Sequence, residues 1–288
     1  MRIAILGMGL IGGSIAHALR RSTTDPHEGP TTIVAWATRP AGPQAALAAG
    51  VVDAAPTELA DAISGAQLMV LAAPPLACLE LLAQLGGPLR GATDPSATLT
   101  DVASTKRAIV ARANALDLPF VGGHPMAGRE ATGFGAADAD LFVDRPWILC
   151  PGAAARDEDL ARVEWLVRAC GGRAIALEAG RHDALAAAIS HVPLVVSAAL
   201  VEAIAGGASW PAAADLGAGG WRDMSRLAKG DPAMGAGIAA TNAAEIAVGL
   251  RQVRAALDAW IGALEVPEPD TEVLRARFAA ARNRVIDG

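Results

Sequence analysis

The sequence predicts an α/β protein, with a doubly wound parallel sheet in the first 178 residues and an all-helical region after it. Three observations favour this fold class. A complete glycine motif, GMGLIG over residues 7–12, lies between a β-type run and a helical run. Short apolar runs then alternate with helix-forming stretches as far as residue 177. From residue 181 strand-like runs disappear, and alanine-rich helical sequence takes over.

The strands of the sheet are expected where apolar runs are bounded by turn residues. They cover 2–6, 32–37, 68–73, 97–102, 118–122, 147–150 and 174–177. Helices are expected between them, over 13–21, 105–115 and 156–170. The near-continuous apolar strand at 68–73 is typical of a parallel sheet covered on both faces. Such sheets bind ligands at the carboxyl ends of their strands, so polar residues there are candidate site residues.

Long helices are expected in the second half of the chain. A helix over 181–204 contains Pro193, where a kink is expected. Asp231 and Pro232 have the N-cap and first-turn residue types of a helix that continues to about residue 264. A proline-rich break precedes a last helix that ends near residue 285. We therefore expect two domains, 1–178 and 179–288. Alanine-rich helices have apolar faces with little bulk. We expect these faces to be buried against a second copy of the same domain, in a homodimer.

Composition and charge exclude several classes of protein. Of the 288 residues, 52% are apolar and 19% are charged, which is typical of a globular protein. The net charge of −6 and the scattered basic residues argue against binding to nucleic acid or to an anionic membrane surface. Three cysteines form no CxxC pair, which indicates a reduced, cytoplasmic compartment. We also expect no membrane span and no metal site, since neither pattern is present in the sequence.

The glycine motif predicts a dinucleotide site. Gly7 allows a tight turn, Gly9 lets the backbone approach a pyrophosphate, and Gly12 packs the helix on the strand. The intervening residues, Leu10 and Ile11, lie where the helix begins, and a helix N-terminus favours an anion. The position of the motif between a strand and a helix makes this interpretation far stronger than the glycine spacing alone.

The residues after the second strand decide which nicotinamide cofactor is expected. Folds of this type that bind NAD usually end this strand with Asp or Glu, which binds the ribose 2′-hydroxyl. Here the strand ends at Ala37 and is followed by Thr38 and Arg39. A guanidinium suits a 2′-phosphate by charge and geometry, so we predict a preference for NADP over NAD. The alternative is that Arg39 faces solvent in a loop.

Two polar residues are expected where neighbouring strands end. His124 follows the strand at 118–122, within the segment GGHPMAGRE over 122–130. Its ordinary pKa near 6.5 lets it accept a proton or a hydrogen bond from a hydroxyl at neutral pH. Ser104 follows the strand at 97–102. We predict that both are catalytic; the alternatives are a structural histidine and a serine that only caps the following helix.

Four more polar residues are candidate substrate ligands. Arg226 follows a glycine-rich loop and can either pair bidentately with a carboxylate or lie in solvent. His191 lies within a predicted helix, either as a ligand or as a buried core residue. Arg129 and Glu130 end the GGHPMAGRE segment and are candidate residues of the rim. Asp183, near the start of the helix that contains His191, has the residue type of a helix cap.

These motifs resemble those of the prephenate/arogenate dehydrogenases of tyrosine biosynthesis. The HPMAG segment together with the SHVP helix is specific, whereas the glycine motif alone is not. Ala73 and Pro74 belong to the matching set and are assigned to the cofactor. The matching segments span roughly residues 1–250 and are GMGLIGGS at 7–14, AAP at 72–74, DVASTK at 101–106, GGHPMAG at 122–128, LF at 141–142 with Trp147, HD at 182–183, SHVP at 190–193, RDMSR at 222–226 and Asn242.

The resemblance implies a Rossmann domain joined to a helical dimerisation domain, with the active site between them. It also implies oxidative decarboxylation of prephenate or arogenate. Hydride leaves the ring carbon that bears the hydroxyl, the ring carboxylate leaves as CO₂, and the ring becomes aromatic. By the same resemblance, His124 polarises or deprotonates that hydroxyl, Ser104 hydrogen-bonds the hydroxyl or His124, and Arg226 binds a substrate carboxylate.

Departures from the family pattern bear on the choice of substrate. Leu194 stands where many members have a second histidine, and Ser225 stands where threonine is common. Arogenate carries an amino group in place of the keto group of prephenate, and Glu130 is able to pair with the resulting ammonium. We therefore predict a lean toward arogenate, or use of both substrates.

Other functions stay open on the sequence. One is an NADP-dependent dehydrogenase of a β-hydroxyacid or an imine on the same two-domain plan, which would use other motifs, commonly a helix lysine. A closer one acts on an amino analogue of prephenate. A function of another class is a non-enzymatic NADP-sensing regulator, which would lack the polar set Ser104, His124 and Arg226.

Overall fold

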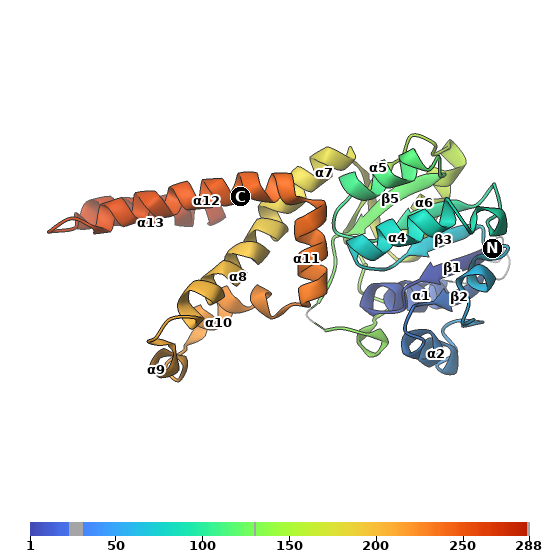
Figure 1. The fold of residues 1–288 in the computed structure, drawn as a ribbon, viewed down its shortest axis with the longest axis horizontal. Helices are drawn as coiled ribbons and strands as arrows, with labels where there is room; N and C mark the ends of the chain where they lie inside the picture. The colour runs from blue at the N-terminus through green and yellow to red at the C-terminus, as the bar shows by residue number, and fades with distance from the viewer. Residues whose placement is uncertain (23–30, 130, 287–288) are drawn as a thin grey trace.

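A computed structural model describes residues 1–22, 31–129 and 131–286. The first part of the chain forms a body around a sheet, and the rest forms a group of helices that extends away from it (Figure 1). Among the described residues the last strand ends at Ala176, and every later element is helical. The two parts meet where helix α7 (Ala179–Ala186) follows the last strand.

A seven-stranded sheet, in the order β2-β1-β3-β4-β5-β6-β7, organises the first part. Because β1 lies between β2 and β3, the chain winds to opposite sides after β1 and after β3. The carboxyl ends of these two strands mark the position at which sheets of this kind bind a ligand. The strands are β1 (Arg2–Leu6), β2 (Thr32–Trp36), β3 (Leu68–Leu71), β4 (Thr98–Asp101), β5 (Phe120–Pro125), β6 (Pro146–Pro151) and β7 (Arg173–Ala176).

The doubly wound fold class is confirmed, with one difference within the sheet. Neighbouring strands run parallel except β5 and β6, which pair antiparallel, with His124 opposite Ile148. For the chain to form a parallel neighbouring strand, it must first cross back to the other end of the sheet, usually through a helix. The described part of the link between β5 and β6 holds only the 3₁₀ turn η2 (Phe134–Ala136), so β6 returns as an antiparallel neighbour.

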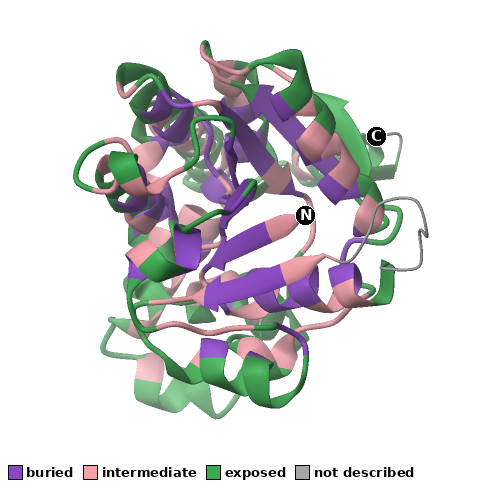
Figure 2. Ribbon diagram, turned by 90° about the vertical axis from the view of Figure 1, so that its right-hand side faces the viewer, coloured by how far each residue is buried: buried purple, intermediate pink, exposed green. Residues whose placement is uncertain are grey.

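Helices cover both faces of the sheet. On one face α1 (Leu10–Ser22) and α6 (Asp157–Ala169) contribute to the same apolar core as Ile3 and Ile5. On the other face Ala4 and Leu6 pack with α3 (Leu59–Ile63), α4 (Pro75–Leu85) and α5 (Arg107–Ala115). Successive residues of β1 thus point to opposite cores, as the two-residue period of a strand requires. Figure 2 shows the buried layer that results along the strands. Helix α2 (Ala41–Ala48) follows β2.

The second part differs from the expected helices at two places. The predicted helix over 181–204 is interrupted by a π turn, η3 (Ala187–His191), directly before α8 (Val192–Ala205). Pro193 lies in the first turn of α8, and its missing N–H explains why the preceding turn is not a regular one. The remaining helices are α9 (Trp210–Ala214), α10 (Gly219–Ser225), α11 (Pro232–Thr241), α12 (Ala243–Leu264) and α13 (Thr271–Ile286).

The prediction of one helix from residue 232 to 264 is wrong. The chain bends by 95° between α11 and α12, at Asn242. The side chain of Asn242 is buried, and its amide bonds the backbone carbonyl of Asp183 and the ring of His191. This residue therefore bonds to α7 and η3 instead of continuing a straight helix.

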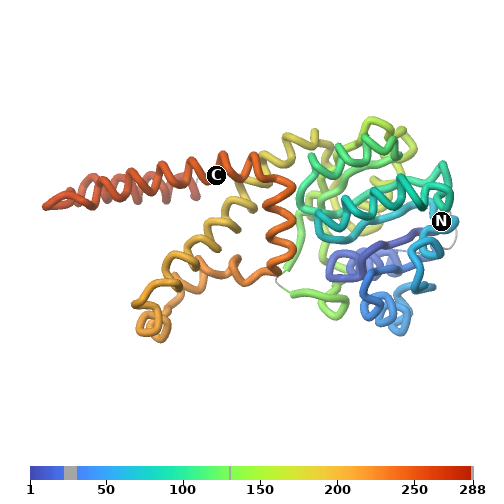
Figure 3. The backbone as a smooth tube through the Cα atoms, viewed as in Figure 1, coloured from blue at the N-terminus to red at the C-terminus, as the bar shows by residue number. Residues whose placement is uncertain are grey.

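Much apolar surface is exposed in the second part. Helix α13 has no buried residue, and Leu257 and Ile261 on α12 are 55% and 49% exposed. Helices α12 and α13 run side by side away from the other elements (Figure 3), in contact through Trp260 and Phe278. The helical run 179–205 is long and apolar enough to cross a membrane by length and composition, and 28% of its most apolar window is buried.

Candidate active site

The glycine motif forms a tightly packed turn with one open position. Gly7 has φ +116°, and its N–H donates to the carbonyl of Trp36 at 2.7 Å. A Cβ on Gly7 would lie 2.1 Å from the carbonyl oxygen of Ala72, and one on Gly12 would lie 2.0 Å from that of Gly7. A Cβ on Gly9 would meet nothing within 4 Å. This geometry fits a dinucleotide whose pyrophosphate lies beside Gly9, against the N-terminus of α1.

The other residues predicted to bind the cofactor follow the carboxyl ends of β1, β2 and β3. They are Leu10 and Ile11 after β1, Thr38 and Arg39 after β2, and Ala73 and Pro74 after β3. Thr38 and Arg39 are exposed, whereas Ala73 is half-buried. Because the three strands are neighbours in the sheet, these residues share one edge with the glycine turn.

His124 lies in β5 and contacts helix α7 of the second part. Its Nδ1 is 2.8 Å from Nε2 of His182, and the two rings meet edge to face with centroids 5.0 Å apart. Nδ1 of His182 is in turn 2.8 Å from a carboxylate oxygen of Asp183. The three side chains form a continuous hydrogen-bonded chain across the junction of the two parts. His124 keeps part of its surface exposed, so a ligand can reach it.

Asp183 caps a helix other than its own. One carboxylate oxygen accepts the backbone N–H of Lys106 at 2.7 Å, and the other accepts that of Arg107 at 2.9 Å. Both N–H groups lie at the start of α5. The N-cap of α7 itself is Glu178. Asp183 thus joins α7 to α5, a role that the expectation of a cap for its own helix did not foresee.

Ser104 lies between β4 and α5 with its hydroxyl buried. Within the described ranges its Oγ has no hydrogen-bond partner. The N-cap position of α5 is Lys106, so Ser104 does not cap that helix. Because buried polar groups in folded proteins are nearly always bonded, an unpaired hydroxyl at this edge is available for a ligand.

His191 and Asn242 join the same cluster from two further elements. His191 is 1% exposed and ends the turn η3. The amide of Asn242 donates to the backbone carbonyl of Asp183 at 2.9 Å and to Nδ1 of His191 at 3.0 Å. Because Nδ1 of His191 accepts, a neutral His191 carries its proton on Nε2. Among the described residues that buried Nε2 makes no hydrogen bond of good geometry, although an interaction with the backbone of Ser104 raises the pKa of His191 against the larger effect of burial.

The electrostatics of the cluster keep His124 neutral. Burial lowers the pKa of His124 well below its ordinary value, and His182, Lys106 and His191 lower it further. Burial also lowers the pKa of His191. Lys106 is fully buried and forms an ion pair with buried Asp101. A neutral imidazole can accept a hydrogen bond, so His124 suits contact with a hydroxyl group.

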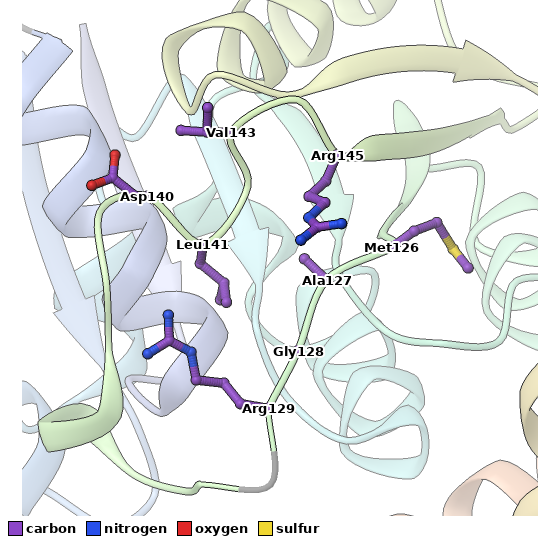
Figure 4. Close-up of a pocket in the computed structure, with 8 residues that line it drawn as sticks. All are labelled: Met126, Ala127, Gly128, Arg129, Asp140, Leu141, Val143 and Arg145. Atoms are coloured by element: carbon purple, nitrogen blue, oxygen red, sulfur yellow. The ribbon is translucent and has the colours of Figure 1, made fainter.

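The remaining predicted substrate residues lie nearer the surface. Arg226 is exposed, at the junction of α10 and the 3₁₀ turn η4 (Leu227–Lys229). Arg129 is exposed and forms an ion pair with Asp138. Figure 4 shows Arg129 beside a pocket of about 410 Å³, between the loop after β5 and the turn before β6, which Arg145 also lines. Glu130 lies outside the described residues.

Sequence reasoning did not single out His182 or Lys106 as members of this cluster. The available signal for His182 was the HD pair at 182–183, directly after the last strand. The partners of that pair depend on how α7 packs against β5 and α5, which no local pattern displays.

Comparison with known families decides where this arrangement belongs. The family model of the prephenate dehydrogenase nucleotide-binding domain matches residues 15–176, and that of the prephenate dehydrogenase dimerization domain matches residues 178–280. The chain belongs to the prephenate dehydrogenase family. This membership confirms the resemblance that the motifs carried; the match to the nucleotide-binding domain begins at residue 15, after the glycine turn.

Curated members of the prephenate dehydrogenase family match most of this chain. The prephenate dehydrogenase of Bacillus subtilis is 32% identical over 237 residues, which cover 81% of this chain and 62% of that protein. The prephenate dehydrogenase of Lactococcus lactis is 30% identical over 84% of this chain and 65% of that protein. The chain therefore spans less than two thirds of the length of these two relatives.

Solved structures from the prephenate dehydrogenase family match the chain over almost its full length. Arogenate dehydrogenase from Synechocystis is 31% identical, with a TM-score of 0.77 and coverage of 99% of this chain and 100% of that one. Prephenate dehydrogenase from Aquifex aeolicus, solved with hydroxyphenyl propionate and NAD⁺, is 25% identical, with a TM-score of 0.85 and coverage of 99% and 98%. A 3-hydroxyisobutyrate dehydrogenase from Mycobacterium tuberculosis, 16% identical with a TM-score of 0.50, shares the fold alone.

Proposed function

We propose that this chain oxidatively decarboxylates prephenate, arogenate or both, with a nicotinamide cofactor, in tyrosine biosynthesis. One observation carries the proposal: a neutral, reachable His124 and an unpaired Ser104 hydroxyl lie at the edge of the sheet that holds the glycine turn. Family membership supports the reaction class. The rival β-hydroxyacid or imine substrates, and a regulator without activity, are not favoured by these relatives.

The residues of the site fit the needs of this chemistry. A bound nicotinamide supplies the acceptor for the hydride that leaves the hydroxyl-bearing ring carbon. His124 accepts the hydrogen bond of the substrate hydroxyl and takes its proton as the carbon–oxygen double bond forms. Ser104 orients the same hydroxyl. Loss of the ring carboxylate as CO₂ then returns an electron pair to the ring, which becomes aromatic.

The rest of the substrate is assigned to residues of the helical part and the loop after β5. We assign a substrate carboxylate to Arg226, because a guanidinium binds a carboxylate through two parallel hydrogen bonds. His191 is assigned as a second donor to the substrate, through its Nε2–H. Arg129 is assigned to the rim of the site, and Glu130, which lies outside the described residues, is proposed to pair with the ammonium of arogenate. Together with Leu194 in place of a histidine, this favours arogenate or use of both substrates.

The cofactor is proposed to be NADP in preference to NAD. Arg39 is exposed beside Thr38 where β2 ends, and the segment carries no carboxylate for a ribose 2′-hydroxyl. An exposed guanidinium at this position can meet a 2′-phosphate.

The assembly is proposed to be a homodimer formed by a helical domain over 179–288, with a cofactor domain over 1–178. The match to a dimerization domain supports it, and so does the exposed apolar surface of α12 and α13. A second copy would also cover the apolar run 179–205, so no membrane is invoked for it. No nucleic-acid partner is proposed, and the cytoplasmic location stays a prediction.

The test is the appearance of reduced nicotinamide, followed by absorbance, with prephenate and arogenate each paired with NAD and NADP. We expect turnover with at least one substrate, with a higher kcat/KM for NADP and for arogenate. A strong preference for prephenate would refute the assigned role of Glu130. Absence of turnover in all four pairings, by a folded protein that binds the cofactor, would refute the activity itself.

A further inference from the structure

We propose that the base of this site is a two-histidine relay, in which His124 takes the substrate proton and passes its own ring proton to His182, beside the carboxylate of Asp183. The substrate of the relay rests on the proposed function, whereas its hydrogen-bond geometry does not. His124 touches the substrate; His182 and Asp183 act through it and are positioning residues. Since His124 belongs to β5 and the others to α7, both parts of the chain supply the base.

Asp183 determines which nitrogen of His182 carries a proton. Burial alone would raise the pKa of Asp183, but hydrogen bonds from His182 and from the backbone N–H groups of Lys106 and Arg107 bring it below its ordinary value. Asp183 is therefore a carboxylate near neutral pH. A carboxylate only accepts hydrogen bonds, so Nδ1 of His182, 2.8 Å away, must carry the proton. Nε2 of a neutral His182 is then an acceptor.

That acceptor determines the protonation of His124 in turn. Nδ1 of His124 lies 2.8 Å from Nε2 of His182, so this nitrogen must donate. Nε2 of His124 is left with a lone pair, which is the form that accepts a proton from a hydroxyl. The opposite tautomer would present an N–H to the substrate and could not act as a base.

The charges around His124 favour transfer of the proton from His124 to His182. Fully buried Lys106, which is ion-paired with Asp101, acts on His124 as a nearby positive charge. Burial, His182, Lys106 and His191 all lower the pKa of His124. A proton that stopped on His124 would place a second cation in this region. On His182 the same charge lies against the Asp183 carboxylate, where Coulomb attraction stabilises it.

Over one turnover, His124 and His182 return to the protonation states in which they began. The hydroxyl proton bonds to Nε2 of His124, while the Nδ1 proton of His124 leaves and bonds to Nε2 of His182. The substrate oxygen forms a double bond to the ring carbon as that carbon's hydrogen leaves with its electron pair as hydride. When CO₂ departs, its bonding pair enters the ring, and the oxygen recovers a proton through the same two histidines. The product is a phenol, and the histidines regain their starting tautomers.

A different explanation for the same contacts is that His182 and Asp183 only brace α7 against α5. Two variants separate the two explanations. In Asp183→Asn an amide NH₂ in place of the oxygen that faces Nδ1 of His182 would donate to that nitrogen and reverse both tautomers, with loss of the hydrogen bond that the same oxygen accepts from Lys106. In His182→Gln the side-chain carbonyl can still accept from Nδ1 of His124, which preserves its tautomer, but it cannot take up a proton. Glu178→Ala is the matched control, since it removes the N-cap of the same helix and leaves the relay intact.

The first measurement is the ¹⁵N chemical shift of the histidine side chains in the cofactor-free protein. We expect Nδ1 of His124 to be protonated in the parent protein and Nε2 to be protonated in Asp183→Asn. In the assay, Asp183→Asn should lower kcat by about two to four orders of magnitude, the range of a misoriented or lost general base. Its affinity for the cofactor should be unchanged.

The second measurement is the pH dependence of kcat/KM. In His182→Gln the positive charge must stay on His124, where burial, the largest cause of its lowered pKa, remains although the effect of His182 is lost. The acidic limb should therefore move to lower pH, and the plateau should fall. Glu178→Ala should leave the limb in place. A parent protein with Nε2 of His124 protonated, or a His182→Gln variant with an unmoved limb, would overturn the relay. If the parent turns over neither substrate, the proposed function fails, and the ¹⁵N shifts still decide the relay geometry.

Discussion

At the scale of single residues, Nε2 of His124 is expected to be needed for turnover but not for binding of the cofactor. His124→Asn keeps a polar side chain but removes the nitrogen that we propose accepts the substrate proton. We expect kcat to fall by roughly 10²- to 10⁴-fold, the usual contribution of a general base. Binding of reduced cofactor, followed by fluorescence titration, should be unchanged, since His124 lies outside the glycine turn. Full activity in this variant would refute its role as the base.

Cofactor choice is also a single-residue property. Arg39 is exposed after β2, so its replacement should not disturb the core. Arg39→Ala should raise KM for NADP about tenfold, because a hydrogen bond to a charged group contributes about 1.5 kcal/mol, and it should leave KM for NAD nearly unchanged. Arg112→Ala, an exposed arginine on α5, is the control. Equal effects on the two cofactors would mean that Arg39 only faces solvent.

Individual site residues could be predicted from sequence only where their position follows from the strand pattern. Ser104 and His124 each lie two positions after the end of a predicted strand, so their shared edge could be expected. His182 could not be placed in the same way, because it lies 58 positions from His124 and meets it only through the packing of α7 on β5. The partners of Asp183 are backbone N–H groups of another helix, and a capping residue type does not say which helix it caps.

At the scale of elements, helix α6 depends on a buried carboxylate at its start. Asp159 accepts hydrogen bonds from Arg156 and from Thr98 in β4. Burial alone would raise the pKa of Asp159, but these hydrogen bonds outweigh it and leave the pKa below its ordinary value. Asp159 therefore stabilises the folded state above the pKa of an unfolded aspartate, near 3.9, and this stabilisation is lost as the pH falls through the folded value.

We expect Asp159→Asn to lower the free energy of unfolding at pH 7 by about 2 kcal/mol, the cost of unsatisfied buried donors. Urea unfolding at a series of pH values measures it. The difference between variant and parent should shrink as the pH falls below about 4, since protonation removes the same charge from the parent. Glu158→Gln, in an exposed pair with Arg156, should change stability by less than about 0.5 kcal/mol. A difference that does not depend on pH would contradict the argument.

Element types were easier to predict than element ends and breaks. The apolar periods of strands and helices are local, and β1 and α6 lie within a residue or two of the expected ranges. The bend at Asn242 was not predictable, because Asn is tolerated within helices and the cause is a buried amide bonded to residues 59 and 51 positions away. The antiparallel pairing of β6 likewise depends on the path of the link after β5, which carries no periodic pattern.

At the scale of the whole molecule, the exposed apolar side chains of α12 and α13 predict self-association. Leu257 and Ile261 lie one helical turn apart on α12 and are half exposed. The double variant Leu257→Glu with Ile261→Glu should shift a dimer toward monomer, because it buries charge in the interface. Sedimentation analysis over a dilution series measures the dissociation constant.

The control for that experiment is Leu47→Glu, an exposed apolar residue on α2 in the sheet-containing part. It should leave the dissociation constant unchanged, since α2 lies far along the chain from the helical part. A parent protein that sediments as a monomer at all concentrations would contradict the homodimer. An unchanged dimer in the double variant would place the interface on another face.

Because of the π turn η3, the number of residues between His182 and His191 determines whether both rings reach the same cluster. In a regular helix the nine positions from His182 to His191 make about two and a half turns, which would put the two rings on opposite sides. The wide turn takes up about one extra residue, so the interval acts like eight positions and both rings reach the cluster around Asp183. Loss or gain of one residue there would swing His191 by roughly 100°. Homologous sequences should therefore align from position 182 to position 191 without gaps, even where residues 187–189 differ.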